Sequence, residues 1–411
     1  MDMVPIGSPQ PEYKVPTPST IPDNDEDQPV PGQAIIESGS YHLPPLIYGA
    51  ATLSRHYNDD STLDSSTPFR AVRLALRYGI NAFDTSPYYG ASEIILGQIL
   101  LALRDQFPRS SYTLITKCGR YGARDFDYSP NTIRQSVLRS LARFGTDYLD
   151  VVYLHDIEFV SAIVRPQQGA GKHAEPLTNE NLATEWGIAE GQEGKIWGPG
   201  DQTVLDALAE LRKMKDEGLI KAVGISGYLL PTLLRLSLMF LKKTGKPIDI
   251  LLSFSHYDIQ NSAFAAYYPV LTGRAQIERV LTASPFSMGL LTPNPPPWHP
   301  APPDLTASVN RVKAWTTNPN GWPDGIANLA LGWAMRREGA VMGAEGKDVP
   351  IVIGWSTPKE IHESVAVWRE VVAVQAGTAD ERARKRKQAE QTARDMFTAD
   401  GWADCSWDHL T

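Results

Sequence analysis

Cysteine is scarce in this chain of 411 residues, in which Cys118 and Cys405 are the only two. Neither a disulfide framework nor a zinc cluster is therefore expected. An excess of positive charge is also missing: the net charge of −8 argues against nucleic acid or an anionic membrane as a partner. The longest apolar run, residues 229–241, contains Pro231 and Arg235 and is too short to span a bilayer. The first residues lack the basic and apolar regions of a signal peptide, so we expect a cytoplasmic protein.

The remaining composition is that of a folded chain with one unusual end. Residues 1–34 are rich in Pro, Asp and Ser without hydrophobic periodicity, which predicts a disordered tail. From residue 41 onward, short apolar runs alternate with longer amphipathic segments, the pattern of repeated β-α units. The predicted strands are 46–49, 81–84, 112–116, 149–154, 222–225, 250–253, 280–283 and 351–354. The predicted helices are 68–78, 92–105, 129–144, 203–217, 230–244, 263–276, 326–338 and 358–373. Eight such repeats predict one α/β domain over residues 41–411, a closed (β/α)8 TIM barrel.

Two long insertions interrupt the repeats, at about residues 158–201 and 293–325. Loops of this length in a compact domain are usually functional or disordered. Both follow predicted strands, so they leave from the face formed by the C-terminal strand ends and are expected to roof a site there. A charged segment, residues 380–387, predicts a solvated helix face rather than a nucleic-acid patch.

Four polar residues lie at or just past the ends of three consecutive predicted strands: Asp84, Tyr89, Lys117 and His155. In a parallel barrel these strand ends carry the active site. An ammonium near a phenol favours the phenolate and lowers its pKa from about 10, and an aspartate keeps that ammonium charged and in place. The imidazole can hydrogen-bond a substrate oxygen. Each residue alone is more often structural, but their order on successive strands predicts proton transfer to and from a carbonyl or hydroxyl oxygen.

The pattern resembles the aldo-keto reductases, whose tetrad has this chain order on these strand ends. The resemblance covers roughly residues 41–374 and includes Tyr78-Gly79-Ile80-Asn81-Ala82-Phe83-Asp84-Thr85 and Val223-Gly224-Ile225-Ser226. The family spaces its acid five residues past the aspartate and directly before glycine, which selects Tyr89 over Tyr88. Residues 115–121, 283–292 and 295–300 resemble a sugar-oxidising subgroup, the NAD-dependent D-arabinose and L-galactose 1-dehydrogenases.

The resemblance implies a nicotinamide cofactor held by the later strands and the last helix. Glu360 stands where NADPH-dependent relatives place an arginine, which favours NAD over NADP, although Lys359 could counter it. Ala283 stands where many relatives carry an aromatic that stacks on nicotinamide, so that stacking is in doubt. His256 and His299 lack a carboxylate or cysteine at ligand spacing, so no metal is expected. The implied cofactor-binding residues are Ser226, Ser253, Ser284, Pro285, Ser287, Gly289, Gly354, Ser356, Glu360, Glu363 and Ser364.

We therefore expect an enzyme that oxidises an aldose of the D-arabinose, L-galactose or L-fucose type at C1 to the aldonolactone with NAD. Tyr57, Trp298 and His299 are the expected substrate-binding residues, because a flat aromatic face suits a sugar. We expect a monomer or weak homodimer. An NADPH-dependent aldehyde or pyridoxal reductase remains an alternative, and so does a non-enzymatic regulatory subunit that senses the cofactor.

Overall fold

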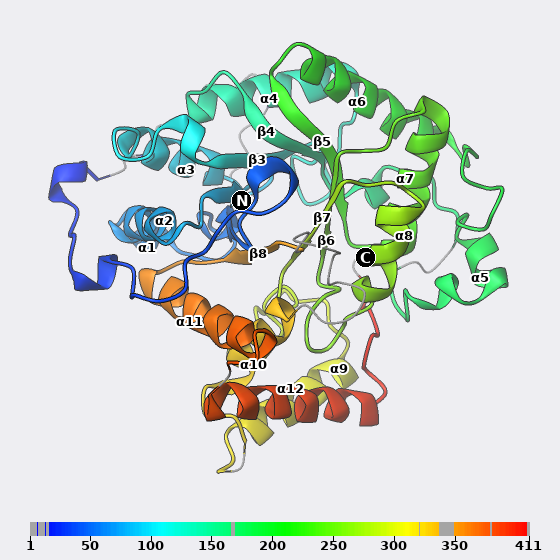
Figure 1. Cartoon of the computed structure of the whole chain (residues 1–411). Coiled ribbons are helices and arrows are strands. Elements are labelled where there is room, and N and C mark those ends of the chain that lie inside the picture. Colours follow the sequence, from blue (N-terminus) through cyan, green and yellow to red (C-terminus); the bar gives the residue numbers. More distant parts are fainter. Residues whose placement is uncertain are drawn as a thin grey trace.

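The strands form a closed barrel, as the sequence predicts. The computed structural model describes Ile6, Tyr13 and residues 16–165, 169–319, 321–336, 349–378 and 380–408. Eight parallel strands follow one another around the barrel in chain order, with helices outside (Figure 1). They are β1 (Leu46–Gly49), β2 (Ala82–Asp84), β3 (Thr113–Cys118), β4 (Leu149–Leu154), β5 (Ile220–Gly227), β6 (Ile250–Phe254), β7 (Arg279–Ala283) and β8 (Ile351–Gly354). The barrel closes between β1 and β8, where Leu46 pairs with Ile351 and Gly49 with Gly354. The predicted (β/α)8 TIM barrel is confirmed.

All eight predicted helices are present. They are α2 (Thr67–Tyr78), α3 (Ser92–Ala102), α4 (Pro130–Phe144), α6 (Pro199–Asp216), α7 (Leu230–Thr244), α8 (Phe264–Gly273), α10 (Gly325–Met335) and α11 (Pro358–Gln375). Among the described residues, three others were not predicted: α1 (Asp60–Leu63), α5 (Glu180–Glu185) and α9 (Pro303–Thr316). Helix α12 (Glu381–Ala399) begins in the charged segment that was expected to be helical and continues well beyond it. Short 3-10 helices are η1 (Pro18–Thr20), η2 (Asp25–Asp27), η3 (Ser40–His42), η4 (Ala50–Thr52), η5 (Arg109–Ser111), η6 (Ile157–Phe159) and η7 (Glu175–Leu177). The second insertion is thus not a continuous loop, because α9 lies within it.

The core has three parts. Inside the barrel, alternate strand residues pack against one another, as the period of two in a strand requires. A larger cluster fills the space between the strands and the surrounding helices. The third joins α9, α10 and α12 through Leu305, Leu329 and Phe397, among others (Figure 1).

Helix α12 corrects the expectation of a solvated helix face at residues 380–387. The Arg386 side chain is fully buried, and its Nε donates to Glu370 Oε2 at 2.6 Å. A second nitrogen of the same guanidinium donates to Asn328 Oδ1 at 2.7 Å. Within the charged run, one face of the helix is therefore exposed to solvent, and another face is anchored to α10 and α11.

The N-terminal strap, residues 16–34, corrects the predicted extent of the disordered tail. Asp27 is buried and accepts a hydrogen bond from Arg70 Nε at 2.8 Å, and Arg77 pairs with Asp23 at 2.6 Å. Arg369 of α11 donates to the carbonyl of Val30 at 3.0 Å. The strap has little apolar surface to bury, and ion pairs with α2 and hydrogen bonds with α11 place it instead.

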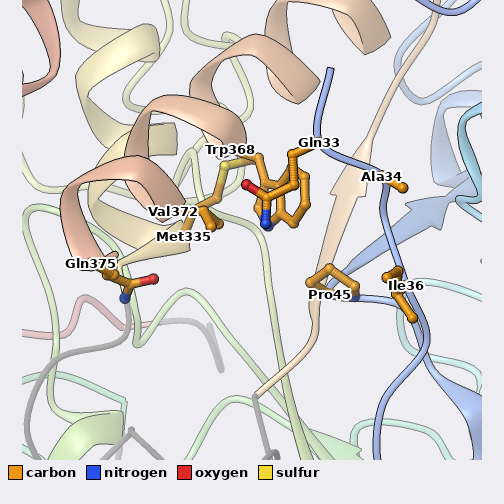
Figure 2. A pocket seen from close by; sticks show the side chains of 8 residues that line it. All are labelled: Gln33, Ala34, Ile36, Pro45, Met335, Trp368, Val372 and Gln375. Carbon is orange, nitrogen blue, oxygen red and sulfur yellow. The ribbon is translucent and has the colours of Figure 1, made fainter. Parts of the chain in front are cut away.

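A cavity of about 210 Å³ lies between this strap and α10 and α11 (Figure 2). Gln33, Pro45 and Trp368 contribute to its wall, and Pro45 directly precedes β1. The cavity therefore opens at the amino ends of the strands, the end of a TIM barrel associated with stability rather than catalysis.

No helix among the described residues is both long and apolar enough to cross a membrane. Within the same residues, no group of three His, Cys, Asp or Glu side chains could hold a metal ion.

A buried carboxylate on α3 fixes the outer side of β3. Glu93 accepts hydrogen bonds from Thr116 at 2.6 Å and Ser140 at 2.7 Å, and it pairs with Arg143 at 2.7 Å. We expect Glu93→Ala to lower the free energy of unfolding by about 3–5 kcal/mol, because Arg143 then stays buried without its partner. Glu93→Gln, which keeps an acceptor, should cost less. Denaturant titration measures both, and equal small losses would contradict this role.

Candidate active site

The structure brings the four predicted catalytic residues together at the carboxyl ends of β2, β3 and β4. Lys117 Nζ donates to Asp84 Oδ1 at 2.5 Å and to the carbonyl of Thr85 at 2.9 Å, and both charged groups are buried. The same ammonium lies 5.1 Å from the centre of the Tyr89 ring. The ring of His155 lies 5.8 Å from that of Tyr89, nearly perpendicular to it. We call these four residues the tetrad.

The phenol of Tyr89 differs from the sequence-based expectation. Burial raises its pKa well above the usual value, the charges of Asp84 and Asp156 act in the same direction, and Arg120 opposes them. The sequence-based expectation of a lowered pKa is therefore wrong for this structure, because burial dominates and Asp84, the ion-pair partner of Lys117, adds to the rise. In this state Tyr89 is a protonated phenol at neutral pH, and therefore a proton donor.

His155 is an uncharged imidazole. Burial lowers its pKa to about 3, with Lys117 and Arg120 adding to the effect and Asp156 opposing it. Its Nδ1 lies 2.9 Å from Ser86 Oγ. A neutral imidazole can direct one N–H and one lone pair, so it can hold an oxygen without carrying a charge of its own.

Two charged residues beside the tetrad were missed by sequence reasoning. Arg120, three residues past Lys117, lies with its guanidinium 4.0 Å from the centre of the Tyr88 ring and donates to Asp156. Asp156 directly follows His155 and has a left-handed backbone, with φ of 53°. Both lie just past strand ends, so the reasoning that selected the tetrad could have found them.

The residues expected near the nicotinamide lie at the mouth of the barrel, the opening formed by the carboxyl ends of the strands. They differ in their exposure to solvent. Ser226 Oγ forms a long hydrogen bond of 3.4 Å to the carbonyl of Leu154. Ser253 Oγ is buried at the end of β6 and forms no hydrogen bond with any described residue. After β7, Ser284, Pro285, Ser287 and Gly289 form a tight turn in which φ is positive at Ser284, Ser287 and Gly289. Ser253 and Ser287 are both almost fully buried, and the hydroxyl of Ser253 can bind the amide of a ligand that reaches it.

The residues expected near the adenosine end of the cofactor mainly cap helix α11. Glu360 accepts the N–H of Ser356 at 2.6 Å, and Thr357 accepts the N–H of Glu360 at 3.3 Å, which forms a capping box. Glu363 pairs with Lys359 at 3.7 Å. Glu360 is therefore a helix cap as well as an exposed negative charge at this end.

Three more of the expected residues fix the β8 turn. Ser364 accepts the indole N–H of Trp355 at 2.8 Å and is buried, so it stabilises the turn instead of facing a ligand. Ser356 accepts a hydrogen bond from Asn58 at 2.8 Å, which links the loops after β1 and β8. Gly354 ends β8, where an added Cβ would lie 3.0 Å from Thr52.

The expected substrate-binding residues form part of an aromatic rim around the mouth. Tyr57, from the loop after β1, and Trp298, from the loop after β7, are both 47% exposed, and their rings lie 6.2 Å apart. His299 accepts the N–H of Ala301 at 3.0 Å with Nδ1, and its Nε2 donates to the carbonyl of Ser287 at 2.9 Å. Since both ring nitrogens are engaged within its own loop, His299 supports Trp298 and offers a ligand only its ring face.

The rim continues beyond the predicted residues. His299 lies 5.0 Å from Trp407, and Trp407 lies 5.3 Å from Tyr228, which follows β5. On the other side, His56 lies 5.4 Å from Tyr88. Trp407 and Tyr228 are almost fully buried and support His299 by packing, whereas Tyr57 and Trp298 expose aromatic faces suited to the mixed apolar and hydroxylated surface of a sugar.

Comparison with known proteins agrees with this geometry. The family model described as Aldo/keto reductase family matches residues 45–381, and the chain belongs to this family. It is 32% identical over 323 residues to D-arabinose 1-dehydrogenase of Saccharomyces cerevisiae, covering 78% of this chain and 81% of that protein. It is 34% identical over 303 residues to L-galactose dehydrogenase of Arabidopsis thaliana, covering 73% of this chain and 77% of that protein. Among solved structures, an aldo-keto reductase from Bacillus halodurans in its holo form has a TM-score of 0.54 at 20% identity, over 88% of this chain and 96% of that chain. This last similarity supports the fold alone.

The two adjacent tyrosines allow a direct test of the acid/base residue. We expect Tyr89→Phe to lower kcat by several orders of magnitude with little change in cofactor affinity, because only the proton route is lost. Tyr88→Phe should have a mild effect, because it keeps the ring that Arg120 covers and loses one hydrogen bond of 3.3 Å. Steady-state kinetics and cofactor titration of both variants measure this, and the reverse order of effects would reassign the acid.

Proposed function

We propose that this chain oxidises an aldose at C1 to the aldonolactone, with NAD as the hydride acceptor, in the cytoplasm and as a monomer or weak homodimer. The observation that carries the proposal is the tetrad, in which a phenol, a buried ammonium and a neutral imidazole surround one position at the mouth. Support for a sugar comes from the aromatic rim and from two relatives named as D-arabinose 1-dehydrogenase and L-galactose dehydrogenase.

In the proposed reaction, each residue of the tetrad has a separate role. Tyr89, as phenolate, takes the proton of the anomeric hydroxyl, and His155 holds the same oxygen through a hydrogen bond. Lys117 stabilises the phenolate, and Asp84 keeps the ammonium in position. Ser226 and Ser253 can hold the carboxamide of a nicotinamide, which accepts the hydride when bound.

One assay tests the proposal and both alternatives. D-arabinose, L-galactose and L-fucose are offered with NAD and with NADP, and reduced cofactor is followed by absorbance while the lactone is identified as product. The proposal expects turnover with at least one aldose, faster with NAD. Turnover only of aldehydes or pyridoxal with NADPH would make the chain a reductase, and cofactor binding without any turnover would favour a regulatory subunit.

The pH dependence of oxidation follows from the raised pKa of Tyr89. Oxidation needs the phenolate, whose fraction grows with pH, so kcat should rise through the alkaline range up to the pKa that Tyr89 has in the complex. Reduction needs the protonated phenol and should fall over the same range. Lys117→Met removes the positive charge, so it should shift the rising limb to higher pH. A pH profile unchanged by this substitution would remove Lys117 from the mechanism.

Cofactor choice is tested at the first turn of α11. Glu360→Arg reverses an exposed charge and should raise NADP use relative to NAD by about tenfold in kcat/KM, which corresponds to about 1.4 kcal/mol. Glu360→Gln is the matched control, because it keeps an acceptor for the cap but removes the charge, and its shift should be smaller. An unchanged ratio in Glu360→Arg would mean that the 2′ position is recognised elsewhere, with Lys359 the first residue to test.

Sugar recognition is tested at the rim. We expect Trp298→Ala to raise KM for the preferred aldose several-fold with little change in NAD affinity, because the exposed indole face is lost. Trp197→Ala is a matched control, since the ammonium of Lys195 already covers that indole at 3.4 Å. Kinetics and NAD titration measure both effects. Loss of NAD affinity with an intact sugar KM would identify the Trp298 loop as a cofactor clasp instead.

A further inference from the structure

The two ring nitrogens of His155 face different partners. Ser86 Oγ, 2.9 Å from Nδ1, also accepts the backbone N–H of Tyr88 at 3.1 Å. That N–H occupies one lone pair of the serine oxygen, and the hydroxyl hydrogen of Ser86 can point at Nδ1. In this arrangement Nδ1 accepts a hydrogen bond from Ser86, so the single proton of the neutral ring is on Nε2.

A carboxylate faces the other nitrogen. Asp156 Oδ2 lies 3.5 Å from Nε2, and a carboxylate offers only acceptor atoms. Its negative charge therefore favours an N–H over a lone pair at that position. The distance is longer than a normal hydrogen bond, so the N–H stays available to a substrate oxygen that approaches the same nitrogen.

The carboxylate is held there by backbone and side chain together. The backbone of Asp156 is left-handed, with φ of 53°, and in this conformation its Oδ2 lies against His155 Nε2. Arg120 donates to the carboxylate, and a second nitrogen of the guanidinium donates to the carbonyl of Ala123 at 3.1 Å. Both side chains are buried, so neither rearranges without breaking these contacts.

We propose that Asp156, held by Arg120 and assisted by Ser86, is a positioning residue that keeps His155 in the tautomer with its proton on Nε2. The imidazole then presents a donor to the substrate oxygen. The opposite tautomer would present a lone pair to an oxygen that gains negative charge as its proton leaves, which is repulsive. The substrate named here rests on the proposed function, whereas the tautomer does not.

The test compares Asp156→Asn with Asp125→Asn. Asparagine has nearly the same shape as aspartate and tolerates the left-handed backbone, so the substitution removes the charge and replaces one acceptor oxygen by an NH2 donor with little change of backbone. Asp125 is exposed in the loop after β3 and provides the same chemical change away from His155. Arg120→Met and Arg120→Lys test whether the ion pair with Asp156 is needed. Arg120→Met should disturb the tautomer of His155, and Arg120→Lys, which keeps the positive charge, should disturb it less.

The tautomer is measured by long-range proton–nitrogen NMR correlation on protein labelled at the histidine rings, with His155→Gln to assign the signal among the eight histidines. We expect an Nε2–H signal in the unaltered protein and in Asp125→Asn, and a mixed or inverted tautomer in Asp156→Asn. Kinetically, Asp156→Asn should lower kcat about tenfold while NAD affinity, measured by fluorescence titration, stays unchanged.

The two proposals can fail separately. An Nε2–H signal and an unchanged kcat in Asp156→Asn would overturn the positioning role and leave Asp156 only as the ion-pair partner of Arg120. A shift of tautomer in a protein that oxidises no aldose would support the positioning role while the proposed function fails. A change confined to folding stability, equal in Arg120→Met and Arg120→Lys, would show that the pair is merely structural.

Discussion

A buried ion pair between Lys117 and Asp84 organises the mouth of the barrel. Removing two charges from water costs several kcal/mol for each ion, and the short contact and the second hydrogen bond to Thr85 offset part of that cost. Strand register makes the contact unavoidable: Asp84 pairs with Ile115, and Lys117 follows two residues later on the same face of β3. The ammonium then lies beside Tyr89, so the position of the acid follows from the pair.

The mouth is closed by a segment far away in the sequence. Residues 400–408, after α12, contact the segments that follow four strands, β4, β5, β6 and β7. Ser406 pairs with Gly171 of the first insertion and hydrogen-bonds His256 at 2.9 Å, while Trp407 packs between Tyr228 and His299. The core cluster that includes α12 therefore also determines where the rim residues lie, and the arrangement of the rim depends on packing at the far end of the chain.

The sequence predicted those features that depend on local pattern. The eight strands and the tetrad could be predicted because each strand is a short apolar run and each catalytic residue lies where such a run ends. The N-terminal strap could not, because Asp27 is ordered by arginines of α2 rather than by apolar burial. Glu360 was expected to recognise the ribose of the cofactor. A capping box also requires a glutamate or glutamine at this spacing from Thr357, so the residue type alone does not distinguish the two roles. Arg120 and Asp156 were missed because the tetrad alone accounted for the chemistry, and their pairing depends on a left-handed backbone that no sequence pattern indicated.

The electrostatics of the site connect the state of Tyr89 to the direction of reaction. Burial, together with the charge of Asp84, favours the protonated phenol, so Tyr89 keeps its proton in the structure and is ready to donate it. Oxidation requires the phenolate form of Tyr89. Additional positive charge near the phenolate oxygen stabilises that form. An oxidised nicotinamide carries such a charge and the reduced form does not, so a cofactor held near Tyr89 would favour the phenolate only in its oxidised state. The buried pair and the neutral His155 leave the site near electrical balance, and in such a site one added charge decides whether Tyr89 gives or takes the proton.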